Sequence, residues 1–138
     1  MRRLRHIPLF AYLLFLYNAV VFANTVVSDF ALGTEILALS LPSGPVFTIN
    51  IGESLLMVGV VALFVEIFKT TQGGAVSTWD HLLAVLTWVG FVVEFVLVAK
   101  AATAIFATLM LMALLEVIAG FTVSSKEGRR GVGVLAEP

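Results

Sequence analysis

Long apolar runs separated by short polar segments follow one another along this chain. Each run is about long enough for an α-helix that crosses the roughly 30 Å hydrocarbon core of a bilayer. The four runs lie at about residues 7–27, 51–68, 81–99 and 103–123. The pattern predicts an all-α integral membrane protein with a single domain, residues 1–138, in which four transmembrane helices form an antiparallel bundle.

Polar residues mark where the predicted helices begin. Asn50 and Glu53 stand at the start of the second helix. Ser77 or Thr78 can cap the third helix, and Asp80 follows Ser77 at the spacing of a capping box. Only a tight turn separates the third helix from the fourth, so we expect these two helices to form an antiparallel hairpin.

The first apolar run fits two kinds of segment. Its basic start, apolar middle and Val-x-Ala site ending at Ala23 are typical of a signal peptide. However, the apolar stretch continues past that site, and Tyr12, Tyr17 and Asn18 are unusual in the apolar part of a signal peptide. We therefore expect this run to be retained as the first transmembrane helix.

Residues 28–50 are too apolar for a free loop and too few for a separate domain. We expect them to form an interfacial external loop that packs on the membrane surface. The turn residues of LPSGP, followed by the alternating VFTINI, indicate a short extended segment. An interfacial helix is the alternative. Its apolar face would consist of Phe30, Leu32, Ile36, Leu37, Leu39 and Leu41.

The composition agrees with a membrane protein. Hydrophobic residues make up 60% of the chain and charged residues 12%, with a mean hydropathy of +1.08. Soluble domains are about half apolar and about a quarter charged. The chain contains no cysteine, which excludes disulfides and thiolate metal sites.

The basic residues predict the orientation in the membrane. Given four spans, only Lys100 falls on one face. The other seven share the opposite face: Arg2, Arg3, Arg5, Lys69, Lys126, Arg129 and Arg130. By the positive-inside rule, both termini are cytoplasmic, residues 28–50 are external, and residues 124–138 form a charged, glycine-rich cytoplasmic tail.

Three lone glutamates within the apolar runs are the candidate functional residues. An ionised carboxylate in hydrocarbon is costly, by at least about 2.5–3.5 kcal/mol, so such residues face protein or water. Glu66 lies closest to the predicted cytoplasmic edge and one turn before Lys69, which favours a shallow ion pair. Glu94 and Glu116 are predicted to lie deeper in the membrane.

Two roles remain open for Glu94 and Glu116. Each can be protonated and hydrogen-bonded to a backbone carbonyl, to Asn18 or to a threonine of another helix, which would hold helices together. Alternatively, they can handle protons or cations, because intramembrane acids serve both purposes.

The sequence predicts no enzyme and no cofactor. His6 and His81 are the only histidines, and both fall at the cytoplasmic edge, where they are poorly placed to hold a membrane haem between them. Together with Asp80 they do not form a recognisable zinc-binding pattern. No phosphate-binding glycine loop or nucleophile elbow is present.

Small residues indicate where helices can approach closely. Gly52 and Gly59 are seven residues apart in the second helix. In the fourth helix, two pairs of small residues stand four apart. These pairs are Thr103 with Ala107 and Ala104 with Thr108. Besides the lipid bilayer, we expect other membrane subunits or a second copy as partners, and no nucleic acid.

Several segments resemble a family of small, four-helix inner-membrane proteins of proteobacteria. The segments are LPSGPVFTINIGE, LFVEIFKTT, DHLLAVLTWV and LLEVIAGFTVS, within about residues 40–125. The resemblance implies a bacterial inner membrane and four helices, but it implies no activity and no functional residues.

Two functions of different classes fit the sequence. The first is an accessory or scaffold subunit that packs against a larger membrane complex through its small-residue faces and surface loop. The second is a small proton- or cation-handling channel or carrier that uses the intramembrane glutamates. We favour the first because the spans are unbroken and no internal repeat is evident. A stress or assembly factor without a stable partner is a third possibility.

Overall fold

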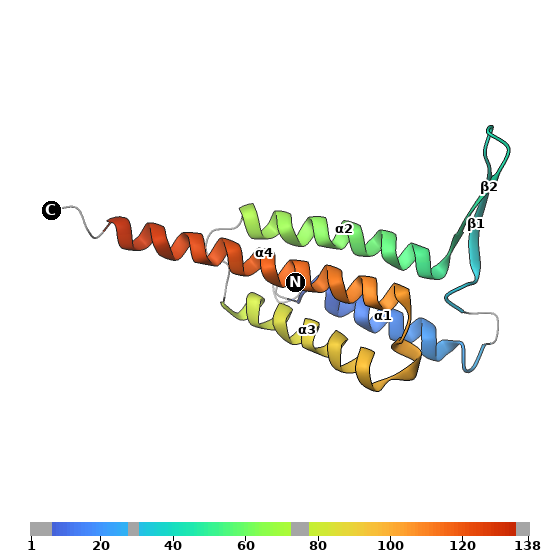
Figure 1. Ribbon diagram of the computed structural model, residues 1–138, viewed down its shortest axis with the longest axis horizontal. Helices are drawn as coiled ribbons and strands as arrows, with labels where there is room; N and C mark the ends of the chain where they lie inside the picture. The colour runs from blue at the N-terminus through green and yellow to red at the C-terminus, as the bar shows by residue number, and fades with distance from the viewer. Residues whose placement is uncertain (1–6, 28–30, 73–77, 135–138) are drawn as a thin grey trace.

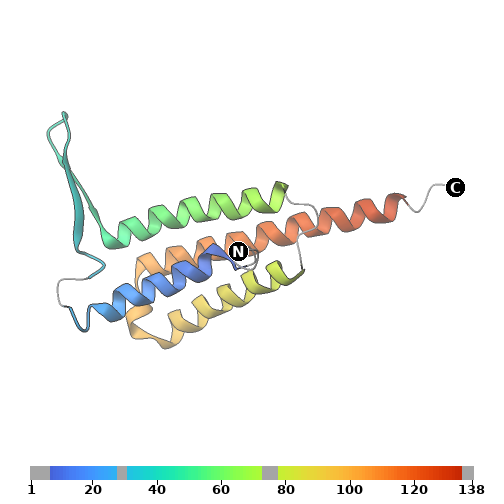
Figure 2. The ribbon, with the colours of Figure 1, turned by 180° about the vertical axis from the view of Figure 1, so that it is seen from behind.

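The computed structural model describes residues 7–27, 31–72 and 78–134, which form four helices and one β-hairpin (Figure 1). The helices are α1 (Leu9–Ala23), α2 (Ile51–Gln72), α3 (Thr78–Leu97) and α4 (Ala104–Val134). The strands are β1 (Glu35–Ser40) and β2 (Val46–Asn50). A short 3-10 turn, Ala99–Ala101, connects α3 to α4. The helices lie side by side along the long axis of the molecule, and α4 packs against the other three (Figures 1 and 2).

Three of the described helices are long and apolar enough to cross a membrane. The apolar parts are Ile51–Thr70 in α2, Trp79–Leu97 in α3 and Ala104–Thr122 in α4. They agree with the predicted spans of the second, third and fourth helices. Helix α1 has 15 residues, so it is shorter than the predicted run of residues 7–27. The chain leaves the helix after Ala23, where Asn24 and Thr25 form a turn.

The end of α4 differs from the predicted tail. The helix does not stop near Val123 but continues to Val134, although its apolar part ends at Thr122. Figure 1 shows the last turns of α4 extending beyond the ends of α2 and α3. The glycines after Thr122 therefore do not interrupt the helix, although a glycine-rich, charged tail was predicted from residue 124 onward.

Aromatic side chains from three helices form the centre of the core. Phe10 and Tyr17 of α1, Phe91 of α3 and Phe106 of α4 are all completely buried. The Phe106 ring lies 4.7 Å from the Tyr17 ring and 5.2 Å from the Phe91 ring, between centroids. Such aromatic pairs add about 0.5–1.5 kcal/mol each to the burial of their surface. The core therefore ties α1 and α3 to α4.

The segment that was predicted to be external contains a β-hairpin. Strands β1 and β2 are antiparallel, and Gly44 supplies the left-handed conformation of the turn, with φ of 104°. This confirms the extended segment predicted from VFTINI, whereas the alternative interfacial helix is wrong over Glu35–Ser40. All of β1 and most of β2 are exposed within the described part of the chain.

Candidate functional site

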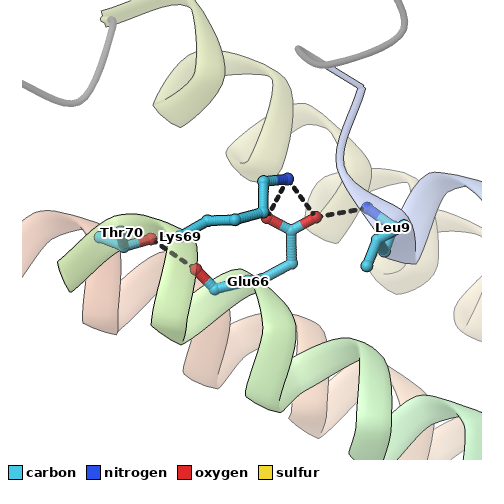
Figure 3. A network of polar contacts seen from close by, with 4 residues as sticks. All are labelled: Leu9, Glu66, Lys69 and Thr70. Atoms are coloured by element: carbon cyan, nitrogen blue, oxygen red, sulfur yellow. Dashed lines mark hydrogen bonds and ion pairs between the residues drawn. The ribbon is translucent and has the colours of Figure 1, made fainter. Parts of the chain in front are cut away.

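The Glu66 carboxylate is the centre of a network that joins α1 to α2. Its Oε1 accepts a hydrogen bond from the backbone N–H of Leu9, at 2.9 Å. Lys69 Nζ lies 3.1 Å from Oε1 and 2.9 Å from Oε2 of the same carboxylate (Figure 3). The predicted pairing of Glu66 with Lys69 is therefore confirmed. The contact with Leu9 could not be foreseen, because it joins residues far apart in the sequence.

Glu66 caps the first turn of α1 from another helix. Pro8 precedes α1 and provides no side-chain cap, so Glu66 supplies the acceptor that the free N–H of Leu9 needs. A negative charge at a helix N-terminus is also favoured by the helix dipole. Glu66 is only 7% exposed, so its side chain is enclosed within the bundle.

Glu116 of α4 faces the same end of the bundle. Its side chain is half-buried. Among the described residues, no hydrogen bond to the Glu116 side chain is present. Within the described part of the chain, Glu116 is therefore not a member of the hydrogen-bonded network around Glu66.

Glu94 makes a different contact, nearer the hairpin end of the bundle. Asn18 Nδ2 of α1 donates a hydrogen bond to Glu94 Oε2 of α3 at 2.9 Å, and another to the backbone oxygen of Leu14 at 3.1 Å. Asn18 was one of the partners predicted for the deeper glutamates. The other carboxyl oxygen, Oε1, is buried without a hydrogen-bond partner among the described residues.

Tyr17 connects α1 to the start of α4. Its hydroxyl donates to the backbone oxygen of Lys100 at 3.2 Å and lies 2.7 Å from Thr103 Oγ1. Thr103 Oγ1 in turn accepts a hydrogen bond from the backbone N–H of Phe106, so it caps α4. The sequence had marked Thr103 only as a small residue. A tyrosine next to Asn18 within an apolar run was the signal that could have revealed this contact.

Gly52 and Gly59 bring α2 close to α4, as predicted. A Cβ at Gly59 would lie 2.8 Å from Leu109 Cδ2 and 3.1 Å from Met112 Sδ. A Cβ at Gly52 would collide with Ile105. Both glycines are buried, and all of these neighbours belong to α4. The absence of side chains at these two positions is what permits the close packing.

The two small-residue pairs of α4 differ in their surroundings. Thr103 is engaged by Tyr17 inside the bundle, and Ala107, one turn later, is half-buried. Ala104 is exposed and Thr108 is half-buried, with its hydroxyl bonded to the Ala104 backbone oxygen. Only the Ala104–Thr108 pair therefore offers an outward surface to a partner helix.

Apolar side chains fill the bundle between the two deeper acids. Glu94 lies one turn before the end of α3, whereas Glu116 lies about three turns into α4. Completely buried Phe91, Phe106 and Leu109 occupy the core around α3 and α4. The described residues show no continuous row of polar groups between the acids.

The histidine that the structure describes is involved in packing. His81 lies against Gly120, where an added Cβ would come 3.0 Å from Nδ1, and its ring is 6.4 Å from the Phe121 ring. His6 lies outside the described residues. Within the described ranges, no three His, Cys, Asp or Glu side chains are grouped in a way that could hold a metal ion.

Comparisons with protein-family models, with curated proteins and with solved structures found no match to this chain. The resemblance to small proteobacterial inner-membrane proteins therefore stays a prediction, and the polar contacts described above carry the functional argument.

Proposed function

We propose that this chain is a non-enzymatic integral membrane protein that acts as an accessory or scaffold subunit of a larger membrane complex. In this proposal the four helices form an antiparallel bundle in a bacterial inner membrane, and both termini are cytoplasmic. The apolar spans and the asymmetry of basic residues support that placement.

The observation that carries the proposal is how the polar groups of the helices are used. Glu66, Glu94 and Tyr17 each form contacts that tie one helix of the bundle to another. In a bilayer such contacts hold helices together, since no hydrophobic driving force acts between them. Meanwhile the outer helix surfaces carry large exposed apolar side chains, suited to lipid or to other apolar helices.

The exposed Ala104–Thr108 face of α4 is the favoured contact for a partner helix. Small residues four apart let two helix backbones approach closely within a bilayer. The test is native electrophoresis of protein extracted in mild detergent, comparing Ala104→Leu with the unmodified chain. We expect the unmodified chain to migrate in a defined large complex and Ala104→Leu to be released from it.

The matched control is Ala19→Leu, which adds the same bulk to an exposed position on α1. We expect it to leave the complex intact. Migration of the unmodified chain as a lone monomer, with no partner recovered by cross-linking in the membrane, would contradict the scaffold proposal.

One observation favours the second function, a proton- or cation-handling carrier. Among the described residues, Glu94 Oε1 is buried without a hydrogen-bond partner, and intramembrane proton transfer depends on buried acidic side chains. The apolar core between Glu94 and Glu116 argues against a continuous path for protons or cations between them.

Flux assays on reconstituted vesicles test the carrier function. If the protein transports protons or cations, the unmodified chain shows a flux, and Glu94→Gln abolishes that flux without loss of folding. No flux from the unmodified protein at any pH gradient would exclude it.

A further inference from the structure

The β-hairpin has one apolar and one mixed face. Cross-strand neighbours share a face of a two-stranded sheet, and successive residues alternate between faces. Leu37 pairs with Ile49 and Leu39 pairs with Phe47, which places four large apolar residues on one face. The opposite face carries the pairs Ala38 with Thr48 and Ser40 with Val46.

Most of the apolar face is exposed within the described part of the chain, and only Ile49 at its base is half-buried. Leu37, Leu39 and Phe47 are 44%, 49% and 45% exposed, respectively. An isolated two-stranded hairpin is at best marginally stable in water and needs something to cover its apolar face. The hairpin therefore needs a cover for its apolar face that the described residues do not supply.

Reciprocal hydrogen bonds fix the hairpin to the bundle at the start of α2. The Asn50 N–H donates to Glu53 Oε2 at 3.0 Å, and the Glu53 N–H donates to Asn50 Oδ1 at 2.8 Å. This is a capping box with asparagine as the cap. Strand β2 therefore passes directly into α2 without a flexible linker between them.

Two backbone hydrogen bonds brace the same joint from the chain before β1. The Ile51 N–H donates to the Thr34 oxygen at 3.0 Å, and the Gly52 N–H donates to the Leu32 oxygen at 2.8 Å. The direction of the hairpin relative to α2 is thus set by hydrogen bonds on both of its sides. Figures 1 and 2 show that this direction runs across the helices, not along them.

The geometry and the charges identify the neighbour as lipid. If the helices cross the bilayer, a hairpin turned across them at the start of α2 lies along the membrane surface. No charged residue occurs between Glu35 and Glu53, and these two carboxylates stand at the base of the hairpin. Charged groups mark the headgroup level, whereas the uncharged segment between them suits the boundary of headgroups and acyl chains.

The helix that follows the hairpin also has exposed apolar side chains. Met57, Val58 and Val61 of α2 are about half exposed or more and would face lipid in the proposed placement. We propose that the β-hairpin is an interfacial anchor whose apolar face, Leu37, Leu39, Phe47 and Ile49, is covered by lipid of the external leaflet. This inference rests on the membrane placement in the proposed function, but not on the accessory role.

Site-directed fluorescence in vesicles tests the anchor. The chain has no cysteine, so single cysteines can be introduced and labelled with a polarity-sensitive bimane dye. Leu39→Cys and Phe47→Cys probe the apolar face, and Ser40→Cys and Thr48→Cys are matched controls from the opposite face of the same strands. Each labelled protein is reconstituted in phosphatidylcholine vesicles, with and without bromine on the acyl chains.

We expect brominated lipid to quench the dye strongly at Leu39→Cys and Phe47→Cys, with blue-shifted emission and little quenching by aqueous iodide. At the two controls, Ser40→Cys and Thr48→Cys, iodide should quench the dye strongly and brominated lipid should quench it little. Iodide quenching at all four positions would place the hairpin in water and overturn the anchor. Protection from both quenchers at the apolar positions would indicate cover by protein, from a partner or a second copy, and would also overturn it.

A label in a span separates this result from a failure of the membrane placement. Leu86 lies within the apolar part of α3 and is 56% exposed. Leu86→Cys should be quenched by brominated lipid. If it is, while the hairpin positions are not, the anchor fails and the membrane placement stands. If Leu86→Cys is not quenched either, the membrane placement itself is wrong, and the anchor is wrong with it.

Discussion

At the residue scale, Glu66 is a buried acid that serves two helices. It is paired with Lys69 on its own helix and accepts the Leu9 N–H at the start of α1. Because Lys69 remains partly exposed, at 43%, water weakens the attraction between the two charges. The hydrogen bond to Leu9 is therefore the contact whose loss should matter more.

Substitutions at Glu66 test this assignment. Glu66→Gln keeps an oxygen that can accept the Leu9 N–H, whereas Glu66→Leu leaves that N–H without its acceptor. We expect leucine to lower the free energy of unfolding by about 1–3 kcal/mol and glutamine to lower it less. Thermal unfolding in detergent measures both, with exposed Glu35→Gln as a control of unchanged stability. Equal losses for glutamine and leucine would show that charge, not the cap, is the important property.

The contact between Asn18 and Glu94 allows a double-substitution test. Glu94→Leu leaves the Asn18 amide with only the Leu14 oxygen as an acceptor, so it should destabilise the protein by about 1–3 kcal/mol. Removing both polar partners in Asn18→Leu with Glu94→Leu should cost less than the sum of the two single losses. Strictly additive losses in thermal unfolding would mean that the two side chains do not interact.

At the scale of single elements, the closeness of α2 and α4 depends on glycine. A Cβ at Gly59 would press on Leu109 and Met112, whereas a Cβ at Gly90 would meet only Leu14 Cδ2 at an ordinary 3.5 Å. Alanine gains up to about 1 kcal/mol over glycine in a helix. Gly90→Ala should therefore raise the melting temperature, and Gly59→Ala should gain less or lose stability. A higher melting temperature for Gly59→Ala than for Gly90→Ala would contradict the close packing.

Local contacts within elements could be predicted from the sequence. The pairing of Glu66 with Lys69 and the start of α2 at Asn50 and Glu53 both depend on residues three apart in the chain. Helix positions could likewise be predicted from the length of the apolar runs. The end of α4 could not, since its helix continues through polar and glycine-containing sequence to Val134.

Contacts between elements were predicted only in outline. Asn18 was named as a possible partner for Glu94 or Glu116, but the sequence could not decide between them. The Leu9 N–H contact with Glu66 was missed because any free helix N-terminus could have met that carboxylate. Strand β1 was missed for a similar reason. The sequence EILALS fits either a helix face or a strand, and only its pairing with β2 makes it a strand.

At the scale of the whole molecule, the hairpin and the long end of α4 lie at opposite ends of the bundle (Figure 1). If the bundle crosses the bilayer, these two features must lie on opposite sides of it. By the positive-inside rule, the seven basic residues assigned to one face predict that the end of α4 is cytoplasmic and the hairpin external. The fold and the charge pattern thus lead to one testable topology.

Cysteine accessibility in intact cells tests that topology, using one substitution at each end. Ser43→Cys lies in the exposed turn of the hairpin, and Gly128→Cys lies within α4 beyond its apolar part. A membrane-impermeant maleimide should label Ser43→Cys in intact cells and Gly128→Cys only after permeabilisation. The reverse pattern would mean an inverted protein. Labelling of both in intact cells would mean that the two ends lie on the same side of the membrane. Three spans between Ser43 and Gly128 would place them on opposite sides, so this result would contradict the predicted topology.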